Sequence, residues 1–138
     1  MQTQPILKRK LKAYTLVEIL VVLVIIGILV FLALPNLLPL INRAKKVEAK
    51  EQLEHVCTLE KTYFYEKSKY TTDLNALGFL QEKLSTDGGR ANYRIEIVNA
   101  TNTTFTARAT AVVDFNGNGV FNVWEIDQDK NIKEVTPN

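Results

Sequence analysis

Residues 14–41 form a nearly uninterrupted apolar run, and this run limits what the chain can fold into more than any other feature. Thr15, Glu18 and Asn36 are its only clearly polar members. A helix of about 20 apolar residues crosses the hydrocarbon core of a bilayer, so the segment is long enough to span a membrane. A carboxylate at the edge of hydrocarbon is costly unless a partner offsets its charge. The run therefore predicts a membrane or assembly helix in which Glu18 requires a partner.

A basic segment precedes the apolar run. Residues 1–13 hold four of the 17 Lys and Arg residues and no acidic residue, so the rest of the chain carries 13 basic and 15 acidic side chains. The basic character therefore belongs to this short segment, and we expect no direct nucleic-acid partner. The positive-inside rule predicts a single pass with the N-terminus in the cytoplasm. A secretory signal peptide is the competing interpretation, but the run is longer than a usual signal and no small-residue cleavage site follows it.

The composition after the apolar run becomes charged but keeps a helical pattern. Val47, Leu53 and Val56 recur at helical spacing among Lys and Glu residues, so one helix is predicted to continue from Tyr14 to about Lys67. Three runs typical of strands follow, and a shorter fourth ends the chain: 92–98, 104–113, 120–127 and 132–135. Turn residues separate these runs, as in an antiparallel meander. We predict an α+β fold in which the amphipathic half of a long N-terminal helix packs on an antiparallel sheet of three to four strands.

This reading divides the chain into three regions. Residues 1–13 form a basic leader peptide, residues 14–41 the hydrophobic transmembrane or assembly half of the helix, and residues 42–138 a globular head. Aromatic side chains between a helix and a sheet belong to the core more often than to a binding surface. The following aromatic residues are therefore predicted to pack in the core: Tyr63, Tyr65, Tyr70 and Trp124.

The sequence contains little that could carry catalysis. His55 is the only histidine and Cys57 the only cysteine, which rules out an intrachain disulfide and a zinc site built from these two residue types. The single histidine serves no catalytic Ser or Cys constellation, and no glycine-rich phosphate loop is present. We therefore predict a protein that is not an enzyme.

The stretch KAYTLVEILVVLVIIGILVFLALP, residues 12–35, resembles the N-terminal methylation motif of type IV pilin and type II secretion pseudopilin precursors. In that motif a leader is cleaved before an aromatic residue, and a glutamate, a glycine and a proline recur in the apolar helix. Tyr14 takes the first mature position here, and Glu18, Gly27 and Pro35 take the other three. Ala13 stands before the cleavage point, where the family usually has glycine.

The resemblance implies a structural subunit of a type IV filament. A prepilin peptidase would cleave the chain between Ala13 and Tyr14 and methylate the new amine. The subunit would then wait in the lipid of the inner membrane until an assembly platform polymerises it through its helix. Its partners would be copies of itself and minor pilins or pseudopilins, in a periplasmic or cell-surface filament, since contacts that do not close generate filaments.

Glu18, Gly27 and Pro35 are the predicted assembly residues. The resemblance implies that Glu18 of one subunit pairs with the methylated amine of a neighbour. The alternatives are that Glu18 pairs with the amine of its own chain or reaches the lipid headgroups. Gly27 and Pro35 both weaken a helix, so the helix between them is predicted to loosen in a filament. The alternative for Gly27 is close helix packing.

Alternative functions stay open at this point. The subunit could belong to a surface pilus or to a type II secretion pseudopilus. A DNA-uptake (competence) pseudopilin uses the same parts. A different class is a single-pass, membrane-anchored adhesion or ligand-binding head that does not polymerise, which would keep an uncleaved N-terminus.

Residues 114–125, DFNGNGVFNVWE, fit the calcium-loop pattern D-x-[DN]-x-[DN]-G-x5-E. Oxygen-bearing side chains at alternate positions around a glycine turn suit Ca²⁺, and the resemblance to major pseudopilins of type II secretion systems, which carry a calcium site in their C-terminal loops, implies such a site here. The predicted ligands are Asp114, Asn116, Asn118 and Glu125, with Asp127 as a further carboxylate. Because strands flank the loop, it is not an EF-hand. Ca²⁺ is the candidate cofactor, and a metal-free hairpin loop is the alternative.

Overall fold

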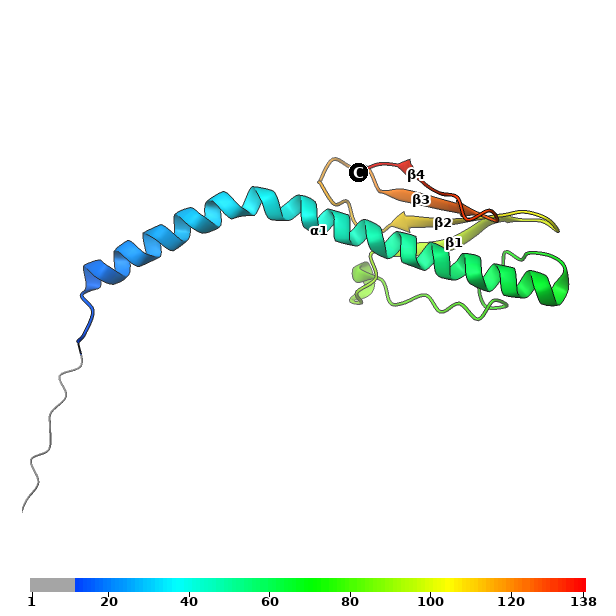
Figure 1. The fold of residues 1–138 in the computed structure, drawn as a ribbon, viewed down its shortest axis with the longest axis horizontal. Helices are drawn as coiled ribbons and strands as arrows, with labels where there is room; N and C mark the ends of the chain where they lie inside the picture. Colours follow the sequence, from blue (N-terminus) through cyan, green and yellow to red (C-terminus); the bar gives the residue numbers. More distant parts are fainter. Residues whose placement is uncertain (1–11) are drawn as a thin grey trace, which may run out of the picture. The chain divides into compact units, whose positions relative to one another are not determined.

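The computed structural model describes residues 12–138, in which one long helix is followed by a four-stranded sheet (Figure 1). Helix α1 (Leu16–Lys67) has 52 residues and continues through Pro35 and Pro39 without a break. The chain divides into two compact units, of which the first ends at Pro39 and the second begins at Leu40. The predicted α+β class, with one long helix and an antiparallel sheet, is confirmed.

The first unit contains the apolar part of α1. Its large apolar side chains from Leu16 onward are 46–78% exposed, and none of its described residues is buried. This helix is long and apolar enough to cross a membrane, with a mean hydropathy of 3.3 over an 18-residue window. The predicted leader lies mostly at residues 1–11, outside the described part of the chain.

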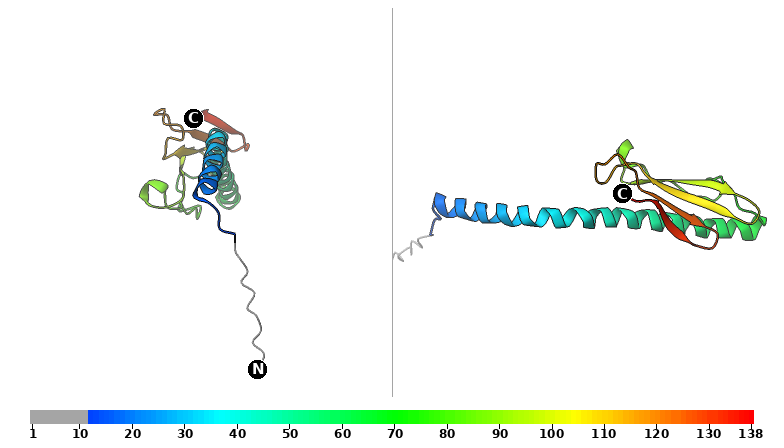
Figure 2. Two further views of the ribbon diagram at one scale, coloured as in Figure 1. Left: turned by 90° about the vertical axis from the view of Figure 1, so that its left-hand side faces the viewer. Right: turned by 90° about the horizontal axis from the view of Figure 1, so that it is seen from above.

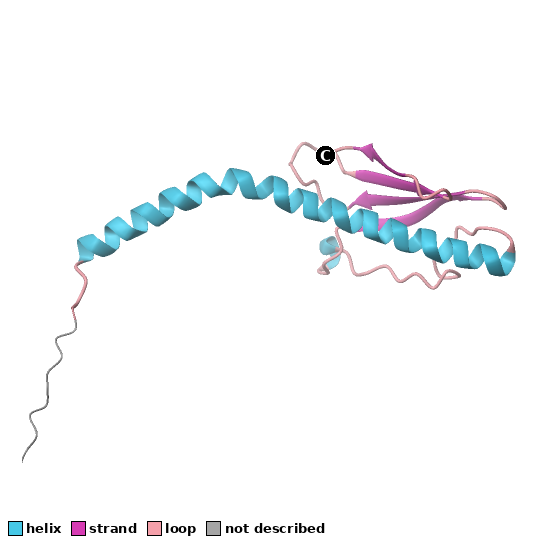
Figure 3. Ribbon diagram, in the orientation of Figure 1, coloured by secondary structure: helices cyan, strands magenta, loops and turns pink. Residues whose placement is uncertain are grey.

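The second unit, the head, contains the rest of α1 and an antiparallel meander. The strands are β1 (Tyr93–Ala100), β2 (Phe105–Ala111), β3 (Val123–Asp127) and β4 (Ile132–Thr136), and they lie side by side in sequence order. Figures 1 and 2 show the strands beside the head portion of α1, and Figure 3 shows loops joining the elements. Buried residues alternate along β1, β2 and β3, so one face of the sheet is covered.

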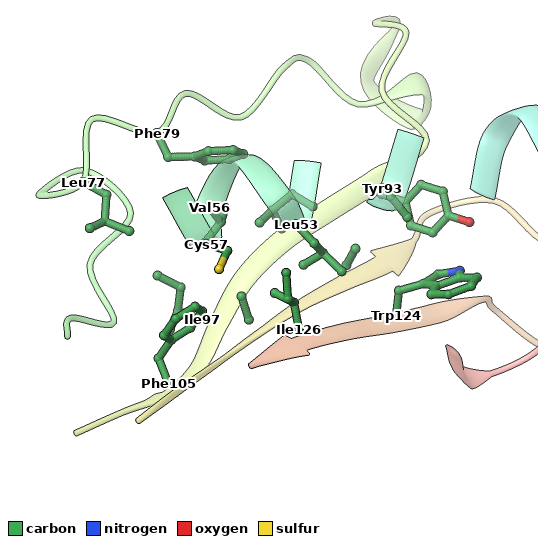
Figure 4. Close-up of a cluster of buried hydrophobic side chains, with 14 of the residues drawn as sticks. Leu53, Val56, Cys57, Leu77, Phe79, Tyr93, Ile97, Phe105, Trp124 and Ile126 are labelled. Carbon is green, nitrogen blue, oxygen red and sulfur yellow. The ribbon is translucent and has the colours of Figure 1, made fainter. Parts of the chain in front are cut away.

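The core of the head lies between α1 and this covered face (Figure 4). The helix contributes Ala49, Leu53, Val56 and Cys57, and the sheet contributes large residues that include Tyr93, Phe105, Trp124 and Ile126. Two expected core positions are wrong, because Val47 is 49% exposed and Tyr65 is 85% exposed. The buried residues of α1 continue to Glu60 instead. The face of the helix that contacts the sheet is therefore rotated slightly from the face that its apolar residues indicate.

A connecting segment, residues 68–84, leads from α1 towards the sheet. It begins at Ser68, whose positive φ of 55° ends the helix. Gln81 fixes its later part to β1, because the Gln81 Oε1 accepts the Ile95 N–H at 2.8 Å and its Nε2 donates to the Tyr93 carbonyl at 3.1 Å. The outer edge of β1 is thereby bonded to a side chain.

Candidate functional site

The N-terminus of α1 is closed by a reciprocal pair of hydrogen bonds between Thr15 and Glu18. The Thr15 N–H donates to the Glu18 Oε2 at 2.7 Å, and the Glu18 N–H donates to the Thr15 Oγ1 at 3.3 Å. This is a capping box, and it places a carboxylate at the positive end of the helix dipole. Thr15 is therefore a partner of Glu18 in its own chain, and it is not among the partners predicted from the sequence, although the T-x-x-E spacing indicates it.

The predicted cleavage point lies just before this capping box. Ala13 and Tyr14 have no regular secondary structure and are exposed, and Tyr14 is 81% exposed. Beside them is an open, mainly apolar groove of about 560 Å³, lined by Tyr14, Val17, Glu18, Ile19, Val21 and Val22. The peptide between Ala13 and Tyr14 is thus outside the helix, where another protein can reach it.

Gly27 and Pro35 both lie inside continuous α1. A Cβ atom added at Gly27 would meet nothing within 4 Å, so packing within the single chain does not require glycine there. Pro35 cannot donate a helical hydrogen bond, yet the helix continues beyond it. Their proposed roles in assembly stay predictions.

The loop at Asp114 is organised by the carboxylate of that residue. Asp114 Oδ1 accepts the N–H groups of Asn116 at 3.1 Å and Gly117 at 2.8 Å, and Oδ2 accepts the Gly119 N–H at 2.6 Å. These hydrogen bonds, above all the one from Gly119, lower the pKa of Asp114. Gly117 and Gly119 have φ angles of 75° and 81°, the left-handed region that glycine adopts without strain.

Asn138 joins this turn from the end of the chain. Its Nδ2 donates to Asp114 Oδ1 at 3.2 Å and also to the Val120 carbonyl. Its own Oδ1 is buried and has no hydrogen-bond partner. Two oxygen atoms of the loop, one from a carboxylate and one from a carbonyl, therefore converge on a single donor.

The structure does not bring the other two predicted carboxylates to this turn. Glu125 Oε1 bonds to the Arg108 guanidinium at 2.7 and 2.9 Å. Asp127 lies at the opposite end of β3, where its Oδ1 accepts the N–H groups of Asp129 and Asn131. Residues 12–138 contain no cluster of three His, Cys, Asp or Glu side chains that could hold a metal. The complete predicted calcium set is therefore not assembled, because β3 directs Glu125 to a neighbouring strand.

Asn122, just before β3, is a structural centre of the head that the sequence did not reveal. It is fully buried, and its Oδ1 accepts the Tyr93 hydroxyl at 2.7 Å and the Trp124 indole N–H at 2.6 Å. Its Nδ2 donates to Glu134 Oε1 at 2.6 Å, and the same oxygen bonds to Lys46 of α1 at 2.7 Å. Burial acts to raise the pKa of Glu134, but hydrogen bonds from Lys46 and Asn122 lower it overall. The Asn122 side chain thus joins β1, β3 and β4, and Glu134 extends this network to α1.

Two family models match the chain. The model described as "Type IV minor pilin ComP, DNA uptake sequence receptor" matches residues 38–119, and the model described as "Prokaryotic N-terminal methylation motif" matches residues 8–34. The first match covers more than half of the 138 residues. The second includes the predicted cleavage point and Glu18.

Two named relatives resemble parts of the chain. The type IV major pilin protein PilA of Myxococcus xanthus (strain DK1622) is 38% identical over 84 residues, which are 61% of this chain and 36% of the relative. The type II secretion system core protein G of Dickeya chrysanthemi is 33% identical over 87 residues, which are 63% of this chain and 57% of the relative. The chain thus matches about a third and just over half of their lengths.

A solved structure has a similar fold. The non-core minor pilin PilV of Neisseria meningitidis superposes with a TM-score of 0.53 and 17% identity, covering 71% of this chain and 90% of the other. At this identity the likeness concerns the fold alone. It agrees with a long helix packed on an antiparallel sheet.

Proposed function

We propose that this chain, which belongs to the type IV pilin family, is a structural filament subunit without enzymatic activity. The family model matches residues 38–119. The observation that carries this proposal is the contrast between the two parts of α1. The head part buries its apolar stripe on the sheet, whereas the part before Pro39 leaves its large apolar side chains at least 46% exposed. Such a surface is stable in lipid or against other copies of itself.

The proposed route begins with processing at the membrane. A prepilin peptidase cleaves between Ala13 and Tyr14 and methylates the new amine, while the N-terminus faces the cytoplasm and α1 crosses the inner membrane. Support comes from the matched methylation motif over residues 8–34 and from the exposed, non-helical Ala13–Tyr14 peptide. An assembly platform then transfers the subunit into a filament with copies of itself and minor subunits.

Glu18 changes partner in this route. Before cleavage it accepts the Thr15 N–H of its own chain. Cleavage creates a cationic amine at Tyr14, and in the filament we propose that Glu18 of one subunit pairs with that amine on a neighbour. The Thr15 N–H is a neutral donor, whereas the amine is a cation, and the attraction of two opposite charges is strong in an apolar surrounding, so the exchange favours assembly.

Two measurements on protein extracted from cells test this function. N-terminal sequencing with intact mass is expected to give a methylated Tyr14 start, and ultracentrifugation is expected to pellet the protein as filaments. A membrane-anchored adhesion head instead predicts a Met1 start and a monomer in detergent. That pair of results would refute the proposal.

The location of the filament distinguishes a surface pilus from a type II secretion pseudopilus. A sheared, extracellular filament identifies a pilus, and a filament retained in the periplasm identifies a type II secretion pseudopilus. The two relatives named above represent these two classes.

DNA uptake is the second candidate function, and the match to the ComP model is the observation that favours it. Against it, the outward face of the sheet carries alternating charges and no basic stripe. Arg108 lies 2.7 Å from Glu125 and 3.8 Å from Glu96, and Lys133 lies 3.8 Å from Glu125. Because a DNA surface depends on unpaired cations, we expect no binding to duplex DNA by fluorescence anisotropy at low salt. Salt-dependent binding there would favour the uptake function.

We retain calcium as a proposed ligand of the Asp114 turn alone. The proposal is supported by the convergence of Asp114 Oδ1 and the Val120 carbonyl on one donor, the Asn138 amide. Asn116 and Asn118 supply further oxygen atoms in the same turn. When bound, Ca²⁺ would supply a fixed positive charge that joins these oxygens.

A further inference from the structure

Glu60 is the only charged side chain that is buried among residues 12–138. It is 0% exposed and lies on the stripe of α1 that also holds Val56 and Cys57. Its Oε2 accepts the Thr71 N–H at 3.2 Å, and its Oε1 is buried without any hydrogen-bond partner. Buried carboxylates normally have several donors or a cation, so this environment suits a neutral carboxyl group.

The connecting segment covers Glu60. Its Tyr70 ring stacks on Phe64 of α1 at 4.9 Å and contacts Phe105 of β2 at 5.0 Å between ring centroids. Further along, Phe79 lies 5.9 Å from the ring of His55. The single hydrogen bond between Glu60 and this segment, from Thr71, therefore lies next to the aromatic contacts of Tyr70.

No cation offsets a charge on Glu60. None of the ion pairs among the described residues includes it. The titratable group that interacts with Glu60 is Tyr70 of the connecting segment, and Cys57, Tyr65 and Asp129 of the β3–β4 turn act on Tyr70 in turn. Burial raises the pKa of Glu60 to about 7, and the Thr71 hydrogen bond opposes this only in part.

We propose that Glu60 is a proton-dependent contact that holds residues 70–79 on helix α1 when its carboxyl group is neutral and loosens them when it is ionised. The ionised carboxylate needs water, and the Thr71 N–H is the only hydrogen-bond donor that the described residues offer it. Residues 75–78 of the connecting segment also line a groove of about 320 Å³ whose other wall is α1, at Leu59, Thr62, Tyr63 and Glu66. Loosening would therefore remove this groove from the surface of the head.

The size of the effect follows from the two pKa values of Glu60. If the released carboxyl returns to 4.5 while the docked one has a pKa of about 7, the opening equilibrium is about 30-fold larger at pH 8.5 than at pH 5.5. This inference concerns the head alone and does not depend on filament assembly.

The test uses the full chain in detergent micelles. A ¹³C-carboxyl NMR titration is expected to give Glu60 a midpoint near pH 7. Amide exchange, corrected for its intrinsic pH dependence, is expected to show about 30-fold lower protection of Thr71 and Phe79 at pH 8.5 than at pH 5.5. Amides of β2, such as that of Ala107, should not change.

Two variants separate Glu60 from a general effect of pH. Glu60→Gln should keep the protection of Thr71 equal at both pH values, whereas Glu54→Gln, an exposed position on the same helix, should behave like the wild type. A Glu60 midpoint below pH 5, or equal protection of Thr71 at both pH values in the wild type, would overturn the proposal. The wild-type titration decides the matter even where Glu60→Gln fails to fold.

Discussion

Replacement of Asn122 by alanine is expected to destabilise the head strongly. The Asn122 side chain is fully buried and makes hydrogen bonds to the Tyr93 hydroxyl, the Trp124 indole, the Glu134 carboxylate and the Thr136 carbonyl. Alanine cannot replace any of these bonds. The elements that meet at this amide therefore lose their shared polar partner.

The magnitude can be worked out from the groups left behind. Tyr93 is 1% exposed and Trp124 is 9% exposed, so their hydroxyl and indole N–H lose their acceptor inside the core. Each buried unsatisfied group costs about 1–3 kcal/mol. Glu134 keeps its 2.7 Å ion pair with Lys46 and so adds less. The two groups together make the expected loss about 2–6 kcal/mol, a large part of the ~5–15 kcal/mol that stabilises a typical domain.

Urea unfolding of the full chain in micelles, followed by far-ultraviolet circular dichroism, measures this loss. Arg108→Ala is the matched control, because its surface ion pairs are worth about 1 kcal/mol or less. Tyr93→Phe removes one of the orphaned groups, so the double variant should be more stable than the sum of the two single effects predicts. A loss below about 1 kcal/mol for Asn122→Ala, or strict additivity with Tyr93→Phe, would refute the reasoning.

Three further predictions concern the helix terminus, pH and calcium. Thr15→Val removes the Oγ1 that accepts the Glu18 N–H and should weaken the first turn of α1 by about 1 kcal/mol. The amide of Glu18 should then exchange faster in micelles, and unchanged exchange would contradict the capping role. Because the pKa of Glu60 is raised from 4.5 to about 7 on folding, its stabilising effect is complete below pH 4.5 and is lost as pH rises to about 7, a change of about 3 kcal/mol. Glu60→Gln should remove this change from urea unfolding, and a wild-type stability independent of pH across that range would show that Glu60 is not shifted. Millimolar Ca²⁺ should raise the melting temperature relative to EDTA in the wild type but not in Asp114→Asn, and identical wild-type midpoints would exclude the calcium proposal.

The apolar run could be interpreted from the sequence because its length alone decides its structure. No other arrangement accommodates residues 14–41 as well as a helix in lipid or among other helices. The T-x-x-E spacing of the capping box was also visible, at Thr15 and Glu18. It was not predicted, because a carboxylate in an apolar run indicates a cationic partner, whereas the Thr15 N–H is a neutral donor.

The buried side of α1 was harder to predict. Apolar letters at Val47 and Tyr65 suggested one face, but the helix buries Ala49 and Glu60 instead. A glutamate in a helical pattern is normally assigned to solvent, since charged residues are rarely fully buried. Only the position of the connecting segment over α1 reveals that Glu60 is covered.

The calcium pattern could not predict where Glu125 lies, because its spacing assumes a different backbone after the loop. In this chain a strand begins at Val123, and side chains along a strand alternate between its two faces. Glu125 thereby reaches Arg108 on β2 at 2.7 Å, and it does not turn back towards Asp114. Glu125 therefore pairs with a neighbouring strand, and calcium binding by the Asp114 turn stays a prediction.

The central claim, assembly through the N-terminal helix with Glu18 as an intersubunit partner, is tested most directly by filament yield. Cells producing the full chain would be compared with cells producing Glu18→Ala, with Glu54→Ala as a control in the head part of the same helix. The account predicts that Glu18→Ala enters the membrane at a normal level but yields at least about tenfold fewer filaments, since an unpaired buried charge costs several kcal/mol. Normal filament yield from Glu18→Ala would contradict it.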